Sequence, residues 1–328
     1  MDAVSTVRDL AHVAELLKAH DRYLIVPHVA PDPDAYGSTC ALALMLRQLG
    51  KTVMLYSDEP VPVTCVFLTE WFPVVHELPP DQETWKLIFV DGGELTREPG
   101  PVRTWRTWMN LDHHLDNGRF AEWIYVDTRA AASALVIARL IDPLGITLDE
   151  PIASCLFTGI LFDTRNAFIT DKCDQELFET IGRLVGAGAR PDHLNRQLNE
   201  QMTMADFKLY GEALAGLSTA MDGKVVYTTL TRAMMDAAGG GDQAMEMLTL
   251  NLPKIAGGEI FILFKEASDG SVKVSLRSKG RLAVNELAKR FNGGGHKFAA
   301  GARFTVPMAE AVKTLVAACE EVVAAPQP

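Results

Sequence analysis

The stretch Trp108-Met109-Asn110-Leu111-Asp112-His113-His114 decides the fold of this chain. It begins as a mostly apolar run, typical of a buried strand, and ends in one aspartate and two histidines. Acids and imidazoles at a strand end are typical of an α/β site, because the carboxyl ends of parallel strands meet at one edge of the sheet. On an extended strand end the two histidines would point to opposite sides, so we expect one to bind metal and the other to face substrate as an acid or phosphate contact.

Three further clusters place the same residue types after apolar runs. They consist of His28 with Asp32 and Asp34, then Asp91, and then Asp163. Asp32 and Asp34 flank Pro33, and in an extended segment the side chains at i and i+2 share one side of the chain. Taken singly, each cluster also fits a polar turn or a capping aspartate. Together they predict a site for two divalent cations, since clustered carboxylates would otherwise repel one another.

The composition is that of a soluble globular protein of two domains. At 328 residues the chain is long for a single core, and its 48% hydrophobic and 22% charged content is ordinary. No apolar run reaches the length of a membrane span, and no signal peptide is evident. The five cysteines are scattered and include no CxxC pair, which disfavours a thiolate zinc site or a disulfide framework and suits a reducing cytoplasm.

The charge is unevenly distributed along the chain. The net charge is −11, yet residues 271–305 carry eight Lys or Arg against one acid, which makes that stretch +7 and the remainder −18. A basic patch on an acidic protein suits a small anionic ligand or a short oligonucleotide and disfavours long duplex nucleic acid. For the charge alone, a solvated charged face is the plainer alternative.

Strands alternate with helices in the first half of the chain. The predicted strands there are 23–26, 52–56, 87–90 and 108–111, and the predicted helices are 35–49, 131–141, 152–162 and 174–185. This order predicts an α/β fold with a mostly parallel sheet covered on both faces, and antiparallel strands at 260–265 and 272–276 predict a smaller second α/β domain. We expect the active site in the cleft between the two domains. The predicted parts are a catalytic domain (1–190), a helical linker (191–221) and a substrate-binding domain (222–328).

The second domain contains a glycine-rich segment among basic residues. Its residues of interest are Gly293, Gly294, Gly295 and His296, together with Ser275, Arg277 and Ser278 on the preceding strand. Successive glycines let backbone N–H groups close around an anion. The pattern therefore predicts phosphate binding, with a flexible loop as the alternative.

These motifs resemble those of the DHH phosphoesterase superfamily. The first four clusters are similar to its metal-binding motifs, and residues 275–278 and 293–296 to those of its DHH-associated C-terminal domain. The resemblance spans residues 8 to 320 approximately and is strongest to the bacterial nanoRNase/pAp phosphatase group, the bifunctional oligoribonucleases. Glu94 and residues 165–168 depart from the family pattern, which bears on the substrate pocket and leaves the proposed ligands intact.

The resemblance implies a ligand set and a mechanism. One metal would be held by His28, Asp32 and Asp91, and the other by Asp34, Asp91, His113 and Asp163, with Asp91 bridging. Oxygen and imidazole donors without thiolate suit Mn²⁺, two ions per site, with Mg²⁺ as the alternative. A water activated by two metals would attack phosphorus in line. His114 would contact the scissile phosphate or assist the leaving group, and Asp112 would orient a histidine.

The resemblance also implies the class of substrate. We expect a hydrolase of short oligoribonucleotides or linear dinucleotides, and of pAp. Its expected partners are short RNA or nucleotides and no membrane, and a homodimer is compatible with this class. The alternatives are an inorganic pyrophosphatase or polyphosphatase-like hydrolase, and a catalytically idle nucleotide sensor. Retention of every proposed ligand disfavours the sensor, and the glycine segment with Arg277 favours nucleotidyl substrates. The choice among short RNA, pAp, pGpG and pApA stays open.

Overall fold

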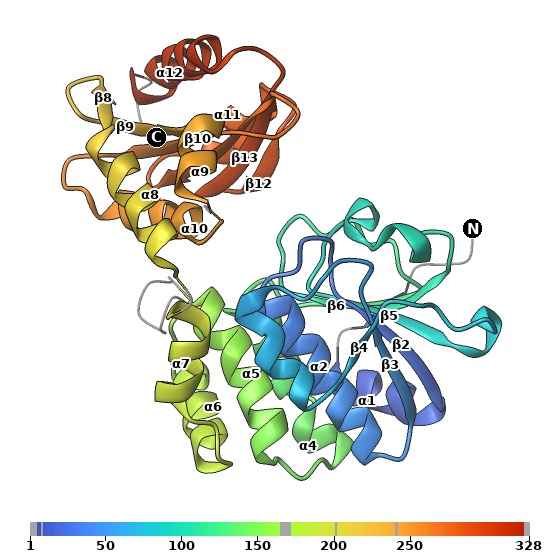
Figure 1. The fold of residues 1–328 in the computed structure, drawn as a ribbon. Helices are drawn as coiled ribbons and strands as arrows, with labels where there is room; N and C mark the ends of the chain where they lie inside the picture. Colours follow the sequence, from blue (N-terminus) through green and yellow to red (C-terminus); the bar gives the residue numbers. More distant parts are fainter. Residues whose placement is uncertain (1–4, 8, 165–171, 201, 240–241, 325–328) are drawn as a thin grey trace. The chain divides into compact units, whose positions relative to one another are not determined.

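The chain forms two compact units, Met1–Gln201 and Met202–Pro328, in a computed structural model (Figure 1). The structure describes residues 5–7, 9–164, 172–200, 202–239 and 242–324. The predicted linker, residues 191–221, is divided between the units, with helix α7 (Pro191–Asn199) in the first and α8 (Met204–Ala215) in the second. Across the described ranges, no helix is long and apolar enough to cross a membrane.

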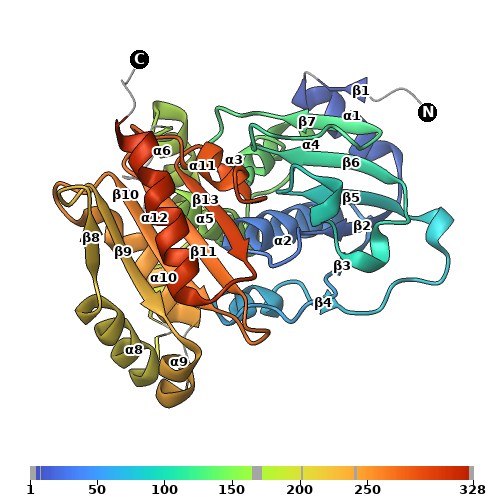
Figure 2. The same ribbon diagram turned by 90° about the horizontal axis from the view of Figure 1, so that it is seen from above.

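The first unit is built on a seven-stranded sheet in which all neighbouring strands run parallel, so the predicted α/β fold is confirmed (Figure 2). Its strands are β1 (Ser5–Thr6), β2 (Arg22–Val26), β3 (Thr52–Tyr56), β4 (Val74–Val75), β5 (Lys86–Val90), β6 (Thr107–Asp112) and β7 (Trp123–Val126). The four strands predicted from apolar runs correspond to β2, β3, β5 and β6. Strands β1, β4 and β7 were not predicted. For β1 and β4 the reason is that two residues at a sheet edge show no periodicity.

The strand order is β1-β7-β6-β5-β2-β3-β4, and the side of the sheet to which the chain adds strands changes between β2 and β5. From β2 the chain moves to β3 and β4 on one side, whereas β5, β6 and β7 lie on the other. The crevice beyond the carboxyl ends of strands at such a reversal is where α/β sheets bind ligands. His28 follows β2 and Asp91 follows β5, so both side chains belong to this crevice.

Helices and one 3-10 turn (63–70) cover one face of this sheet, and loops with short 3-10 turns cover the other. The helices are α1 (Leu10–Ala19), α2 (Pro33–Gln48), α3 (Ser133–Ala138), α4 (Ile141–Leu144), α5 (Glu150–Asp163) and α6 (Gln175–Gly186), and the 3-10 turns are η1 (Val63–Glu70), η2 (Gln82–Thr84), η3 (Leu95–Arg97) and η4 (Gly100–Val102). Along β2, Tyr23 and Ile25 pack on the helical side, and Leu24 and Val26 pack with Trp85 on the other. Both faces are therefore buried, which explains the continuous apolar runs of the central strands.

Helix α2 begins two residues before its predicted start, and this changes the geometry of the first acidic cluster. Asp32 is the N-cap, and its Oδ1 accepts hydrogen bonds from the backbone N–H groups of Asp34 and Ala35, both at 3.0 Å. Pro33 occupies the first turn, where its missing N–H costs nothing. The extended geometry predicted for Asp34 is therefore wrong, because this residue already lies in the helix.

Helices α2 and α5 approach each other closely at two glycines. A Cβ atom on Gly37 would lie 2.5 Å from the carbonyl oxygen of Cys155, and one on Gly159 would lie 2.5 Å from Oδ1 of Asp34. A larger side chain at either position would force the helices apart. The close approach brings Asp163, one helical turn beyond Gly159, toward Asp34.

The second unit holds a six-stranded sheet in the order β12-β13-β11-β10-β9-β8, with only the β9–β10 pair parallel. Its elements are β8 (Ser218–Ala220), β9 (Val225–Leu230), α9 (Arg232–Ala238), α10 (Asp242–Asn251), η5 (Leu252–Lys254), β10 (Ile260–Glu266), β11 (Val272–Ser278), α11 (Val284–Lys289), β12 (Gly294–His296), β13 (Ala299–Phe304) and α12 (Met308–Ala324). Phe261 packs with α8 and α10 on one face, while Ile262 packs with α11 and α12 on the other. This smaller α/β unit agrees with the prediction.

Candidate metal centre

Asp91 lies at the centre of the candidate site. It follows β5 in a left-handed conformation, with φ of 61°, which Asp and Asn adopt more readily than most residues. Its two oxygens face different histidines: Oδ1 lies 3.7 Å from Nε2 of His113, and Oδ2 lies 3.7 Å from Nε2 of His28. These separations are longer than hydrogen bonds, so an ion fits between each pair of atoms. A carboxylate that offers one oxygen to each side is suited to bridge two cations.

Two groups of ligand atoms flank Asp91. On one side His28 Nε2 lies 3.8 Å from Oδ2 of Asp32, the oxygen that the helix cap leaves free. On the other side His113 Nε2 lies 3.2 Å from Oδ2 of Asp163. Within each of the groups His28–Asp32–Asp91 and Asp34–His113–Asp163, the ligand atoms all lie within 4.8 Å of one another. The structure thus gathers all six residues that the sequence singled out as metal ligands.

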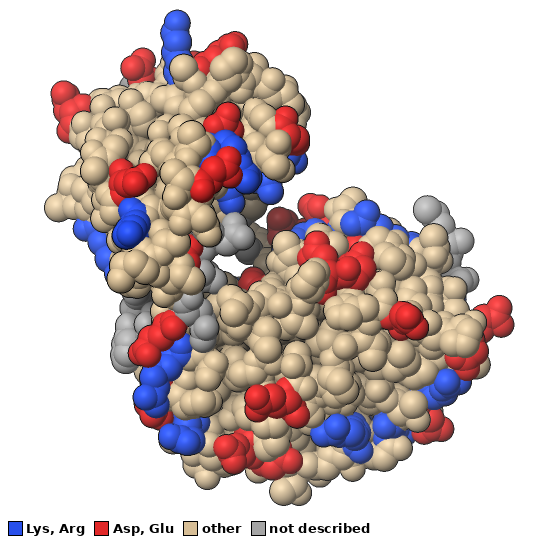
Figure 3. Space-filling model, viewed as in Figure 1, with Lys and Arg blue, Asp and Glu red and all other residues tan. Residues whose placement is uncertain are grey.

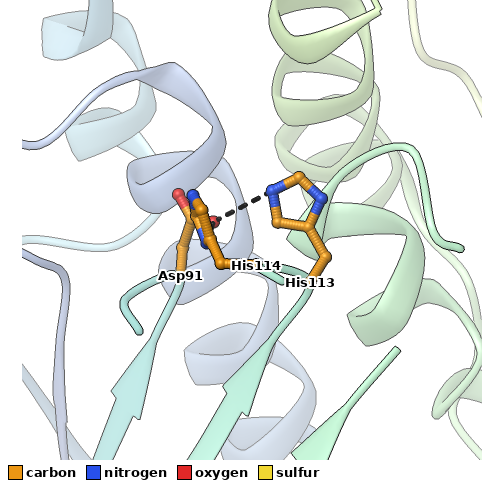
Figure 4. Close-up of side chains that lie close together, drawn as sticks. All are labelled: Asp91, His113 and His114. Atoms are coloured by element: carbon orange, nitrogen blue, oxygen red, sulfur yellow. Dashed lines mark ion pairs between the residues drawn. The ribbon is translucent and has the colours of Figure 1, made fainter. Parts of the chain in front are cut away.

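His113 and His114 do not point to opposite sides, which corrects the sequence-based expectation. Strand β6 ends at Asp112, so the histidines lie beyond the extended backbone, and their rings meet edge to face with centroids 4.6 Å apart. Both rings turn toward Asp91 (Figure 4), and His114 Nδ1 lies 3.8 Å from Oδ1 of Asp91. Their surroundings still differ, because Nδ1 of His114 is 2.6 Å from Oδ1 of Asp112, whereas His113 faces Asp163.

The electrostatics of the two histidines differ accordingly. Burial lowers the pKa of His113, which favours the neutral ring, the form that binds metals. Burial opposes charge on His114 too, but the hydrogen bond to Asp112 outweighs it and raises the pKa of His114 to about 9. The same contact outweighs burial at Asp112 and lowers its pKa to about 2. A protonated His114 beside an ionised Asp112 suits a group that contacts a phosphate.

Several of the clustered acids resist ionisation in the absence of a cation. Burial, helped by the charge of Asp91, raises the pKa of Asp34 to about 7, and burial with the charge of Asp32 raises that of Asp91 to about 6. Burial and Asp34 raise the pKa of Asp163 well above its ordinary range. Asp32 is the exception, since His28 outweighs burial and lowers the pKa of Asp32 to about 2. The chemistry of these donors, carboxylate and imidazole without thiolate, fits a divalent metal.

Ser133 at the start of α3 holds two of the acids, and the sequence gave no signal for it. Its hydroxyl donates to Oδ1 of Asp91 at 2.7 Å, and its backbone N–H donates to Oδ2 of Asp34 at 2.7 Å. The N–H of Ala134 donates to the other oxygen of Asp34 at 2.9 Å. These contacts orient both carboxylates from a segment about 100 residues away from Asp34.

Asn110 and Asn117 support the turns that carry Asp91 and Asp112. Asn110 Nδ2 donates to the carbonyl oxygens of Phe89 and Gly92, at 3.2 and 3.1 Å, on either side of Asp91. Asn117 Nδ2 donates at 2.7 Å to Oδ1 of Asn110 and also to Oδ2 of Asp112. A single polar residue inside the apolar run of β6 was the available signal for Asn110.

The residues predicted to bind phosphate in the second unit are only partly brought together. Ser275 and Arg277 share one face of β11 and line a pocket with Phe261. Ser278 lies on the other face, where its hydroxyl donates to the carbonyl oxygen of Leu282 at 2.6 Å. Residues 294–296 are not a free loop, because they form β12 and pair with β13. The departures at residues 165–168 lie outside the described residues.

The fold and this centre define a metal-binding α/β protein, and comparison with known proteins gives its family. Residues 22–160 match the DHH family, N-terminal domain, and residues 222–325 match the DHHA1 domain. A relative in Thermus thermophilus, the bifunctional oligoribonuclease and PAP phosphatase NrnA, is 33% identical over 88% of this chain and 86% of its own length. The chain belongs to the DHH family, which confirms the resemblance.

Two solved structures share the fold. An exopolyphosphatase-related protein from Bacteroides fragilis aligns over 95% of both chains, with a TM-score of 0.83 and 23% identity. RecJ from Thermus thermophilus in complex with Mn²⁺ aligns over 99% of this chain and 56% of its own length, with a TM-score of 0.57 and 15% identity.

Metal uptake is expected to release protons, and more of them at pH 6 than at pH 8. Asp34 and Asp91, with pKa values of about 7 and about 6, hold protons at pH 6 that a cation must displace. The apparent metal affinity should therefore strengthen as pH rises through this range. Calorimetry in two buffers of different ionisation enthalpy measures the protons released.

Asp34→Asn serves as the control for this prediction, because it removes the group with the higher of the two pKa values. In the metal-free protein the same raised pKa values act on folding stability, and in the opposite direction to metal affinity. The protonated carboxyl groups favour the folded state at low pH, and this stabilisation is lost as the pH rises through the raised pKa values. Proton release that is equal at pH 6 and pH 8 would contradict the account.

Proposed function

We propose that this protein is a divalent-metal-dependent phosphoesterase that hydrolyses short oligoribonucleotides or linear dinucleotides, and pAp. The observation that carries the proposal is the position of Asp91, whose two oxygens face two separate groups of ligands. This arrangement is typical of two-metal sites that hydrolyse phosphate esters. The name of the Thermus thermophilus relative supports the substrate class.

Mn²⁺ is the proposed metal, with two ions per site. His28, Asp32 and Asp91 would hold one ion. The other would be held by Asp34, Asp91, His113 and Asp163. Carboxylate and imidazole donors suit Mn²⁺ and also accept Mg²⁺. When bound, the two ions would acidify a water molecule and neutralise charge on the phosphate.

The chain's own groups divide the remaining work. Ser133 fixes the carboxylate of Asp91 so that each oxygen keeps its direction. His114, held by Asp112, presents a proton to the phosphate or to the leaving oxygen. Asp34 and Asp91 are buried, which strengthens the charge interactions that they make.

The second unit is proposed to bind the part of the substrate beyond the scissile phosphate. We expect Arg277→Ala to lower turnover of a dinucleotide by about 10- to 100-fold, since a charge-assisted hydrogen bond is typically worth about 1.5–3 kcal/mol. A small artificial phosphodiester should be cleaved almost as fast as by wild type. Parallel assays of both substrates provide the measurement.

Arg290→Ala is the matched control, because Arg290 lies in the same unit and pairs with the exposed Glu321. It should behave as wild type on both substrates. Equal losses on the two substrates for Arg277→Ala would mean that Arg277 acts in the chemical step, and the proposed division of labour would be abandoned.

Chain length offers the test of the proposed substrate class. Turnover is expected to be fastest on dinucleotides and trinucleotides and to fall for oligomers of about ten or more, because outer phosphates meet repulsion from an acidic protein. The face in Figure 3 shows acidic and basic side chains dispersed over the first unit, without a continuous basic track. The assay should include pAp, pyrophosphate and tripolyphosphate with Mn²⁺.

The outcomes of this assay separate the alternatives. Faster cleavage of long single strands would favour a processive exonuclease. Faster hydrolysis of pyrophosphate or tripolyphosphate than of nucleotides would support a pyrophosphatase or polyphosphatase-like hydrolase. Nucleotide binding without turnover of any compound would support a nucleotide sensor.

A further inference from the structure

Arg97 lies against the outer edge of one proposed metal ligand. Its Nη2 atom is 3.0 Å from Nδ1 of His28. The opposite ring nitrogen of His28, Nε2, faces Asp32 and Asp91 at 3.8 and 3.7 Å. The imidazole therefore separates a guanidinium group from the metal centre by the width of one ring.

The backbone that carries Arg97 is fastened from two directions. Its carbonyl oxygen accepts a hydrogen bond of 2.7 Å from the N–H of Val29, the neighbour of His28. Arg103 donates to the carbonyl oxygens of Thr96 and Glu98, on either side of Arg97. This anchoring makes the position of Arg97 a property of the fold rather than of a free surface side chain.

The contact between Arg97 and His28 competes with a second contact at the same atom. Nδ1 of His28 also lies 2.7 Å from the carbonyl oxygen of Val29. A guanidinium nitrogen can only donate and a carbonyl oxygen can only accept, so Nδ1 cannot satisfy both. When Nε2 binds a cation, the ring proton resides on Nδ1 and is donated to Val29.

Metal binding therefore deprives Arg97 of its acceptor on His28. Among the described residues, no other hydrogen bond or ion pair of the Arg97 side chain is present. The side chain is partly exposed. A partly exposed guanidinium with free donors beside a dinuclear metal centre is suited to an anion that arrives with the substrate.

We propose that Arg97 binds a non-bridging oxygen of the substrate's phosphate, next to His114, once His28 has bound metal. The inference rests on the proposed function and adds a phosphate contact from the first unit. Burial and the positive charge of Arg97 both lower the pKa values of His28 and His114, against the carboxylates that raise them, so Arg97 is within electrostatic reach of both rings.

A purely structural role for Arg97 predicts a different result. If the guanidinium only oriented His28, its removal would weaken metal binding and leave phosphate binding intact at saturating metal. A phosphate contact predicts the reverse, because the hydrogen bond that His28 Nδ1 donates to the carbonyl oxygen of Val29 and the anchored backbone keep His28 in place without the Arg97 side chain.

The test measures binding of inorganic phosphate and of AMP to the Mn²⁺-saturated full chain by calorimetry. Arg97→Ala is expected to weaken both affinities about 10- to 100-fold, as for loss of a charge-assisted hydrogen bond. The Mn²⁺ affinity should stay within about threefold of wild type, since no ligand atom is removed. Arg97→Lys should recover part of the phosphate affinity, because the charge remains without the planar pair of donors.

Arg129→Ala is the matched control, since the Arg129 side chain is 91% exposed and pairs with Asp127. It should leave both affinities unchanged. Phosphate and AMP affinities that remain at the wild-type level in Arg97→Ala would overturn the proposal, as would a loss confined to Mn²⁺ affinity. These measurements require no turnover. If wild type failed to cleave any short nucleotide while Arg97 still governed phosphate binding, the proposed function would fail and this inference would stand.

Discussion

Replacing Asp91 is expected to abolish hydrolysis. Asp91→Asn should lower kcat on the order of 10³-fold or more, because two-metal charge stabilisation is worth several kcal/mol and each tenfold in rate corresponds to about 1.4 kcal/mol. Asparagine is chosen because it tolerates the left-handed backbone at this position and can still accept the hydrogen bond from Ser133. Mn²⁺ titration with a turnover assay measures the effect, and the number of bound ions should fall below two.

The matched control is Asp21→Ala. Asp21 is 90% exposed and pairs with Lys51 away from the cluster, so its loss should change neither turnover nor the metal content. Asp91→Ala provides a second variant, which removes both oxygens at the cost of a strained backbone. Near-normal turnover of Asp91→Asn at saturating Mn²⁺ would show that Asp91 does not bridge two ions.

Removing His114 is expected to slow chemistry without removing metal. His114→Ala should lower kcat by about 10²- to 10⁴-fold, the usual range for loss of a positioned acid. The Mn²⁺ affinity should be unchanged, because Nδ1 of His114 is engaged by Asp112 and the metal groups are complete without it. Single-turnover hydrolysis and metal calorimetry on the same preparation measure the two quantities.

Asp112→Asn extends this prediction. Asp112 acts through His114, so its replacement should reduce kcat by about 10- to 100-fold, less than the loss of His114 itself. Asp91, His113 and His114 also form a compact group of ligand atoms, so the alternative role of His114 is that of a metal ligand. A loss of bound metal in His114→Ala would identify His114 as a ligand.

Much of the fold followed from the order of apolar runs. Strands buried on both faces read as continuous apolar runs, such as residues 23–26 in β2 and 87–90 in β5, which is why they could be predicted. The polar residues that follow them could be assigned to one edge, because parallel strands end together. The edge strands β1 and β4, each of two residues, carried no such signal.

The ligand set was likewise visible along the chain, whereas the residues that hold it were not. His28, Asp91 and His113 stand out because charged or imidazole groups seldom follow an apolar run without a reason. Ser133 and Arg97 are ordinary in sequence, and each gains a role only from a contact with a residue 42 to 99 positions away.

The sequence by itself determined the class of fold, the family and the residues available to bind metal. Composition, apolar periodicity and the identity of donor atoms are local properties, so they can be read without coordinates. Only the tertiary structure decided how each carboxylate is aimed. Asp32 gives one oxygen to the α2 cap and the other to the site, Asp91 faces two histidines at once, and His113 packs edge to face on His114. These directions depend on helix starts, on the close approach of α2 and α5 and on long-range hydrogen bonds, none of which has a local pattern.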